Sequence, residues 1–100
     1  MNKLIDNKEK LIEDLNKAEK ELVKKEMQLK KEVADLWLGE EIKEKCSNDN
    51  QRKSFVTKNS LTLKEDVELL KLKVNHIKRE INLVDDKIKY DLLIKGGVSL

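Results

Sequence analysis

The chain has 100 residues, of which 42% are charged, 38% are hydrophobic and 3% are aromatic, and its formal net charge is +2. One hundred residues suit a single domain, and the charge content lies far above the roughly 25% of an average globular protein, which favours long helices with solvated faces. The absence of proline and the few aromatic residues argue against all-β and α/β folds and against the thick core that surrounds an enzyme pocket.

The composition also bears on the compartment. Cys46 is the only cysteine, which excludes an intramolecular disulfide and a cysteine-based zinc site and suits a reducing compartment. No apolar run approaches the roughly 20 residues of a membrane span, and no signal-peptide segment follows Met1. The preference for Lys over Arg, with frequent Asn and Ile, is typical of AT-rich bacterial or phage genomes. We therefore expect a protein of the cytoplasm of a bacterial host cell, without a membrane partner.

The first half of the chain predicts a helix over about 3–45. Apolar residues recur at spacings of four and three, which keeps them on one helical face: Leu4, Leu11, Leu15, Ala18, Leu22, Leu29 and Leu36. Lys8, Lys25, Glu32 and Gly39 interrupt this grid. Pairs of opposite charge four residues apart, such as Glu41 and Lys45, support an exposed helix by roughly 0.2 to 0.5 kcal/mol each.

A polar cluster predicts that the chain reverses at about 46–50, because Ser, Asn and Asp side chains favour caps and turns. The segment at about 51–58 fits either a short separate helix or part of the loop. Thr62 and Glu65 then have the spacing of a capping box at the start of a second long helix.

The second long helix is predicted over about 62–94, with a flexible tail at 95–100. Its apolar residues alternate at spacings of four and three without interruption and form what we call the seam: Leu63, Val67, Leu70, Val74, Ile77, Ile81, Val84 and Ile88. If opposed residue numbers sum to about 96, the early grid meets the seam in one register. The sequence therefore predicts an all-α fold, an antiparallel two-helix coiled-coil hairpin forming a single domain over 1–100.

A second apolar line follows the late helix off the seam, around His76. Burying it between two copies would give a homodimeric four-helix bundle; the alternative is that scattered surface apolar residues need no explanation. We call this line the α4 ridge and take it as the predicted self-association surface: Leu69, Leu72, Leu83 and Tyr90.

No catalytic constellation is apparent. His76 is the only histidine, and it has neither a cysteine nor a serine three or four residues away, so a structural or exposed role is favoured over catalysis. Several convergent ligands are needed to bind a metal, and Gly96-Gly97 lacks the strand and helix of a phosphate loop. We expect no enzyme activity, no cofactor and no metal site.

The most distinctive residues flank the reversal, where the only Trp, the only Phe and one Arg gather in a combination enriched in interaction hot spots. We call these the tip residues, and they are the predicted partner-binding site: Trp37, Lys43, Arg52, Lys53 and Phe55. In the competing local interpretation, Trp37 and Phe55 plug the end of the coiled coil and Arg52 pairs with Glu41 or Glu44. Basic and aromatic side chains also suit nucleic acid, although interleaved acids cancel much of the field.

The order Asp35-Leu36-Trp37-Leu38, then Asn50-Gln51-Arg52-Lys53, then Ile88-Lys89-Tyr90 resembles the small helical-hairpin proteins encoded in early regions of phages and prophages of low-GC Gram-positive and related bacteria. The resemblance spans most of the chain and implies a phage accessory protein that acts beside recombination or replication proteins or inhibits a host system. It carries over no catalytic residues. We therefore expect a protein–protein interaction module, a regulator or inhibitor; the alternative is a nucleic-acid-binding hairpin dimer.

Overall fold

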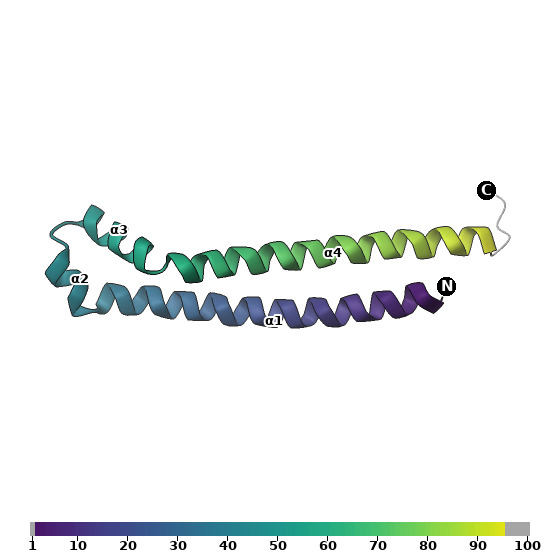
Figure 1. Cartoon of the computed structure of the whole chain (residues 1–100), viewed down its shortest axis with the longest axis horizontal. Coiled ribbons are helices and arrows are strands. Elements are labelled where there is room, and N and C mark those ends of the chain that lie inside the picture. Colours follow the sequence, from purple (N-terminus) through teal and green to yellow (C-terminus); the bar gives the residue numbers. More distant parts are fainter. Residues whose placement is uncertain (1, 96–100) are drawn as a thin grey trace. The chain divides into compact units, whose positions relative to one another are not determined.

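The computed structural model describes residues 2–95, and all of its regular elements are α-helices (Figure 1). Four helices follow one another: α1 (Asn2–Leu38), α2 (Glu40–Lys45), α3 (Asp49–Asn59) and α4 (Leu61–Lys95). Within this described range there is no strand, so the predicted all-α class is confirmed. Of the expected tail at 95–100, Lys95 belongs to α4 and the other residues lie outside the described range.

The first helix ends earlier than expected, at the residue before Gly39. The sequence predicts one helix over about 3–45, whereas α1 ends at Leu38 and a separate α2 begins at Glu40. Gly39 has φ −70° and ψ 156°, and a Cβ at this position would lie only 3.2 Å from the Asp35 carbonyl oxygen. Because glycine is roughly 1 kcal/mol less favourable than alanine inside a helix, Gly39 is the point where leaving the helix costs least.

The reversal is also shorter than predicted. Between α2 and α3 only residues 46–48 are non-helical, whereas the sequence predicts a reversal over about 46–50. Asn48 is the N-cap of α3, and its side chain accepts a hydrogen bond from the backbone N–H of Gln51. An Asn in this position starts a helix immediately after itself, which explains why α3 already begins at Asp49. The segment left open between helix and loop is therefore helical.

One residue, Ser60, joins α3 to α4. Its backbone N–H donates to the Val56 carbonyl oxygen at 3.0 Å, and its buried hydroxyl donates to the same oxygen at 2.7 Å. Its own carbonyl oxygen accepts from the Lys64 backbone N–H at 3.0 Å. Ser60 therefore closes one helix and opens the next, so α4 begins one residue before Thr62, where the predicted capping box with Glu65 would have started it.

Residues 2–20 of α1 and 72–95 of α4 form one compact unit, unit 1, in which the two segments run in opposite directions (Figure 1). Its buried residues are Ala18, Val74, Ile77 and Val84. Lys8 Nζ lies 2.6 Å from Asp85 Oδ1. The expected register would place Lys8 opposite Ile88, and Asp85 precedes Ile88 by nearly one helical turn, a distance that the long lysine side chain spans.

Residues 21–71 form a second compact unit, unit 2, which contains the rest of α1, all of α2 and α3, and the start of α4. Ile42, Cys46 and Val56 form a buried cluster, and Val33, Leu36 and Phe55 pack against it. Val67 and Ser60 are also buried. Each unit thus has its own buried residues, and the single domain over 1–100 stays a prediction.

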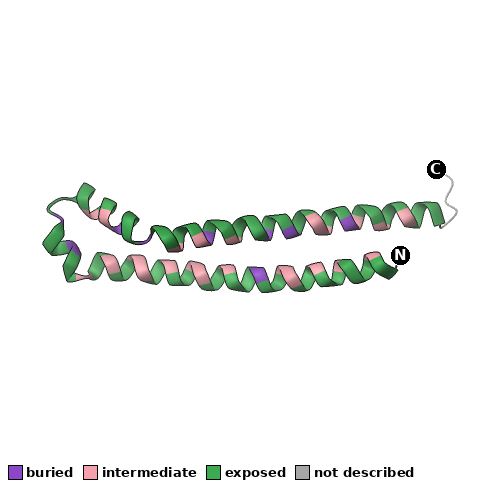
Figure 2. Cartoon of the chain, in the orientation of Figure 1, coloured by how far each residue is buried: buried purple, intermediate pink, exposed green. Residues whose placement is uncertain are grey.

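The predicted seam is confirmed within each unit. All eight seam residues of α4 are buried or half-buried, and so is every residue of the early grid. Along α4, Figure 2 shows buried and half-buried residues recurring on one side while the rest of the helix is exposed. Lys8, Lys25, Glu32 and Gly39, which interrupt the early grid, are half-buried on the same face. The fold therefore accepts three charged side chains on this face of α1.

Candidate functional site

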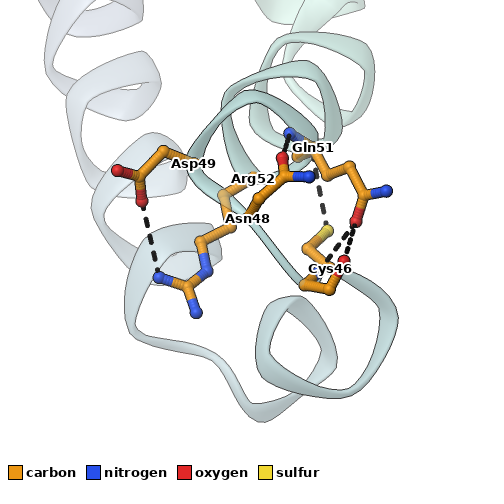
Figure 3. Close-up of polar contacts among 6 residues, drawn as sticks. Cys46, Asn48, Asp49, Gln51 and Arg52 are labelled. Carbon is orange, nitrogen blue, oxygen red and sulfur yellow. Dashed lines mark hydrogen bonds and ion pairs between the residues drawn. The ribbon is translucent and has the colours of Figure 1, made fainter.

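A small hydrogen-bond network holds the turn between α2 and α3 (Figure 3). Asn48 Oδ1 accepts from the Gln51 backbone N–H at 2.8 Å, while Gln51 Oε1 accepts from the Ser47 backbone N–H at 2.8 Å and from the Ser47 hydroxyl at 2.9 Å. This is the reciprocal pattern of a capping box, shifted by one residue because the glutamine side chain reaches the residue before the cap. The turn is thus fixed from both sides by Gln51.

Cys46 packs at the base of this turn. It is buried and free, its thiol lies 3.6 Å from the Gln51 carbonyl oxygen, and its neighbours in the cluster are Ile42 and Val56. Free cysteines commonly behave as small buried hydrophobic residues. The structure therefore gives Cys46 a packing role, which the sequence did not indicate.

Two of the tip residues come together on one surface of unit 2. Trp37 is 40% exposed at the end of α1 and lines a hollow together with Lys53 of α3 and Lys64 of α4. The remaining lining residues of this hollow are Leu29, Val33, Val56, Thr57 and Ser60. Lys64 is not among the predicted tip residues, because only the one-residue connection at Ser60 brings the start of α4 next to α3.

The other tip residues lie elsewhere on unit 2. Phe55 is half-buried against the cluster and lines a separate hollow that includes Lys45 and Lys58. Lys53 and Phe55 are two residues apart, or about 200° around a helix, so they lie on opposite sides of α3. Lys43 is exposed on α2. The tip residues therefore do not form one patch, and Trp37 and Phe55 do not form one plug.

Ion pairs reduce the positive charge around the turn. Lys45 Nζ donates to Glu41 Oε1 at 2.8 Å, and this hydrogen bond, together with the charge of Glu41, raises the pKa of Lys45. Arg52 Nη1 lies 3.7 Å from Asp49 Oδ1, so Arg52 pairs within α3 instead of with Glu41 or Glu44. Within the described residues, Lys43, Lys53 and Lys58 take part in no ion pair.

The second candidate surface is the α4 ridge. Leu69, Leu72, Leu83 and Tyr90 are 64%, 65%, 54% and 64% exposed. Tyr90 lies about 200° around the helix from Ile88, and Leu83 lies about 200° from Ile81 and about 100° from Val84, so both point away from the seam. In unit 1 they line a shallow hollow together with Leu4. Within unit 1 the ridge therefore lies away from the seam, and at Leu83 and Tyr90 it borders Leu4 of α1.

The remaining chemistry-bearing residues are isolated. The His76 side chain is 72% exposed on the line of the ridge, and its Nε2 lies 3.8 Å from Glu80 Oε1, an ordinary pair of helical neighbours. Within residues 2–95, no three side chains from His, Cys, Asp and Glu are placed to hold a metal ion. None of the described helices has both the length and the apolar character that crossing a bilayer requires.

The comparisons with known proteins add no relative. No protein-family model, no curated protein and no solved structure matches the chain.

Proposed function

We propose that the chain is a non-enzymatic protein–protein interaction module. The observation that carries this proposal is that many large apolar side chains stay exposed, among them Trp37 at its hollow in unit 2 and the four residues of the α4 ridge. Exposed apolar patches are typical of interaction sites, and Trp and Tyr are enriched among the residues that contribute most to binding. Both surfaces lie outside the buried seam, so a partner can engage them without unfolding the protein.

The architecture that we propose is the antiparallel two-helix hairpin, with α1 and α4 as its arms and α2 and α3 at its tip. Support comes from each unit separately. Lys8 pairs with Asp85 in unit 1, and Val33 and Ser60 line one hollow in unit 2; both pairs of residue numbers sum to 93. One register thus fits both, and its sum is three lower than the predicted sum of about 96. Spin labels at Lys3 and Lys43 should lie at least about 50 Å apart in a straight hairpin, and a much shorter distance would contradict it.

The hairpin is proposed to form a homodimer, a four-helix bundle, through the α4 ridge. Sedimentation equilibrium of the 11.7 kDa chain should give about twice the monomer mass. Replacing Leu69 and Leu83 with Lys should shift the protein to monomer with unchanged helix content, because both side chains are exposed in the single chain and surface substitutions shift stability by roughly 0.5 kcal/mol or less. A wild-type monomer at high concentration would exclude this dimer.

Of the tip residues, Trp37 and Lys53 share one hollow, and the partner site is proposed there. A stoichiometric protein recovered with the wild-type chain from bacterial host lysate, and then purified, provides the binding assay. Lys53→Ala with Arg52→Ala should weaken this binding by about 1 to 3 kcal/mol with little change in melting temperature, and Lys24→Ala, at an exposed position in α1, is the matched control. Wild-type affinity in the double variant would move the site away from the tip.

The resemblance to phage-encoded hairpin proteins supports a biological setting for this activity. We propose that the chain acts in the cytoplasm of a bacterial host cell, as a phage accessory protein that regulates or inhibits a protein of the recombination, replication or defence machinery. Expression in the host should then alter one of these processes, and the Lys53→Ala, Arg52→Ala variant should lose the effect. An unchanged effect in that variant would separate the host phenotype from the tip.

One observation favours a second candidate function, nucleic-acid binding. Trp37 lies in the same hollow as Lys53 and Lys64, which combines a stacking surface with two positive charges. Affinity for single-stranded DNA or RNA would then fall steeply as salt rises, because binding releases counterions, whereas a mostly apolar protein contact would weaken far less. If nuclease treatment of the lysate abolishes recovery of the bound partner, nucleic-acid binding is favoured over binding to a protein.

A further inference from the structure

The outer face of α4 in unit 1 carries a second stripe with the same alternation of four and three as the seam. Every residue in it is exposed. We call it the symmetric stripe: Leu72, His76, Arg79, Leu83, Asp86, Tyr90 and Leu93. A stripe with this period keeps one side of a helix facing a partner helix over several turns. It therefore has the spacing of a coiled-coil contact that the single chain does not use.

The stripe is chemically symmetric about its central residue. Leu83 lies in the middle, and the next stripe residue on either side, four residues before it and three residues after it, is Arg79 or Asp86, which have opposite charges. The next steps lead to the rings of His76 and Tyr90, and the last steps lead to two leucines, Leu72 and Leu93. Read from either end, the stripe thus presents leucine, ring, charge, leucine, opposite charge, ring and leucine.

We propose that a second copy of this chain packs antiparallel on the symmetric stripe, with Leu83 at the two-fold axis. This inference rests on the self-association proposed above and specifies its helix, its direction and its register. In this arrangement Leu72 of each copy meets Leu93 of the other, and His76 meets Tyr90. Arg79 of each copy meets Asp86 of the other, so one contact surface serves both chains, as a two-fold interface requires.

The charges decide between the two directions. In a parallel pair, Arg79 would face Arg79 and Asp86 would face Asp86, which places like charges next to each other inside an apolar contact. In the antiparallel pair both contacts join opposite charges, and polar residues on the contact line itself specify the register of coiled coils. Within the described residues neither Arg79 nor Asp86 takes part in an ion pair. Both are therefore available to a second copy.

Residues beside the stripe agree with this direction. Glu80 and Lys87 follow Arg79 and Asp86 by one position each, on the same flank. In the antiparallel register Glu80 of one copy lies close to Lys87 of the other, and the two-fold axis repeats this pair. The contact covers about 30 Å of helix, so the dimer should be concentration-dependent.

Charge reversal tests the register. Arg79→Glu leaves two acids facing each other at both contacts, and Asp86→Arg leaves two bases, so each single variant should be largely monomeric at a concentration where the wild type is dimeric. An equimolar mixture of the two variants should recover the dimer as a heterodimer, because every contact again joins opposite charges. Lys78→Glu changes the charge in the same way at an exposed position of α4, on the flank opposite Glu80 and Lys87, and this variant should stay dimeric.

Each result decides a definite question. A wild-type monomer would overturn both the proposed self-association and this inference. The register would be wrong, although the self-association would stand, if neither charge reversal weakened the dimer. The same conclusion would follow if the two single variants stayed monomeric when they were mixed. Circular dichroism of every variant should match the wild type, because these side chains are exposed in the single chain.

Cysteine cross-linking tests the direction independently, in a Cys46→Ser background. Leu72→Cys should cross-link to a Leu93→Cys chain, because the two positions face each other across the antiparallel contact. Leu72→Cys alone should give no covalent dimer, because its two copies would lie about 30 Å apart, beyond the reach of a disulfide. Efficient cross-linking of Leu72→Cys with itself would show a parallel pair and overturn the proposal.

Discussion

Truncation of Ile42 to alanine should strongly destabilise the protein. Ile42 is 2% exposed and packs with Cys46 and Val56. The substitution removes three buried carbon atoms, worth about 0.8 kcal/mol each in transfer free energy, and the cavity raises the cost into the range of about 2 to 5 kcal/mol measured for such truncations. Because alanine is the better helix former by up to about 0.5 kcal/mol, we expect a net loss of about 2 to 4 kcal/mol.

Urea unfolding followed by far-ultraviolet circular dichroism measures this loss. With a slope of about 1 to 3 kcal/mol per molar urea, the midpoint should fall by about 1 M or more. Ile12→Ala is the matched control: Ile12 is 39% exposed, so the same truncation should cost roughly half as much or less. Equal midpoints for the two variants would refute the packing of α2 against α3 that follows from the break at Gly39.

Three further predictions concern the turn between α2 and α3. Asn48→Ala should lower the free energy of unfolding by about 1 kcal/mol through loss of the N-cap, whereas Asn50→Ala, at an exposed position inside α3, should change it by roughly 0.5 kcal/mol or less; similar losses would rule out a stabilising cap. In an NMR titration, Lys45 should have a pKa above its ordinary value because Glu41 holds its charged form, a preference that is lost as pH rises through that pKa, and Glu41→Gln should lower it. The Cys46 thiol, which is buried, should react with an alkylating reagent far more slowly in the native protein than in denaturant, and equal rates would contradict its burial.

The all-α class, the apolar grid of α1 and the seam of α4 could be predicted from the sequence, because each of them depends on many residues at once. An apolar face that repeats over five or more turns is buried as a whole against another helix. Single charged residues on it, such as Lys8 or Glu32, therefore do not change the predicted fold. The break at Gly39 could not be predicted in the same way. One glycine changes the helix by roughly 1 kcal/mol, and what α2 gains by turning is the contact of Ile42 with Val56, which no local pattern contains.

The candidate site shows the same limit. Trp37, Lys53 and Phe55 are predicted to form one site because all three lie near the reversal. Residues two positions apart in a helix point about 200° apart, so Lys53 and Phe55 lie on opposite sides of α3. The position of Phe55 follows from the burial of Val56 next to it, which requires knowing that the segment is helical. Lys64 joins Trp37 only because Ser60 alone separates α3 from α4.

The two faces of α4 lead to a last prediction, in which neighbouring residues respond differently to the same substitution. Val84 is 4% exposed on the seam, whereas Leu83 is 54% exposed at the centre of the symmetric stripe. Lysine at position 84 places a charge among apolar side chains, which costs several kcal/mol unless the charge is paired, so Val84→Lys should lower the melting temperature sharply. Leu83→Lys should keep the single chain folded and remove only the dimer, because its charge stays in water until two copies meet. Melting temperature and sedimentation, measured on both variants at a concentration where the wild type is dimeric, separate the two effects; a Leu83→Lys chain that unfolds like Val84→Lys would show that the outer face contributes to the fold and is not free for a partner.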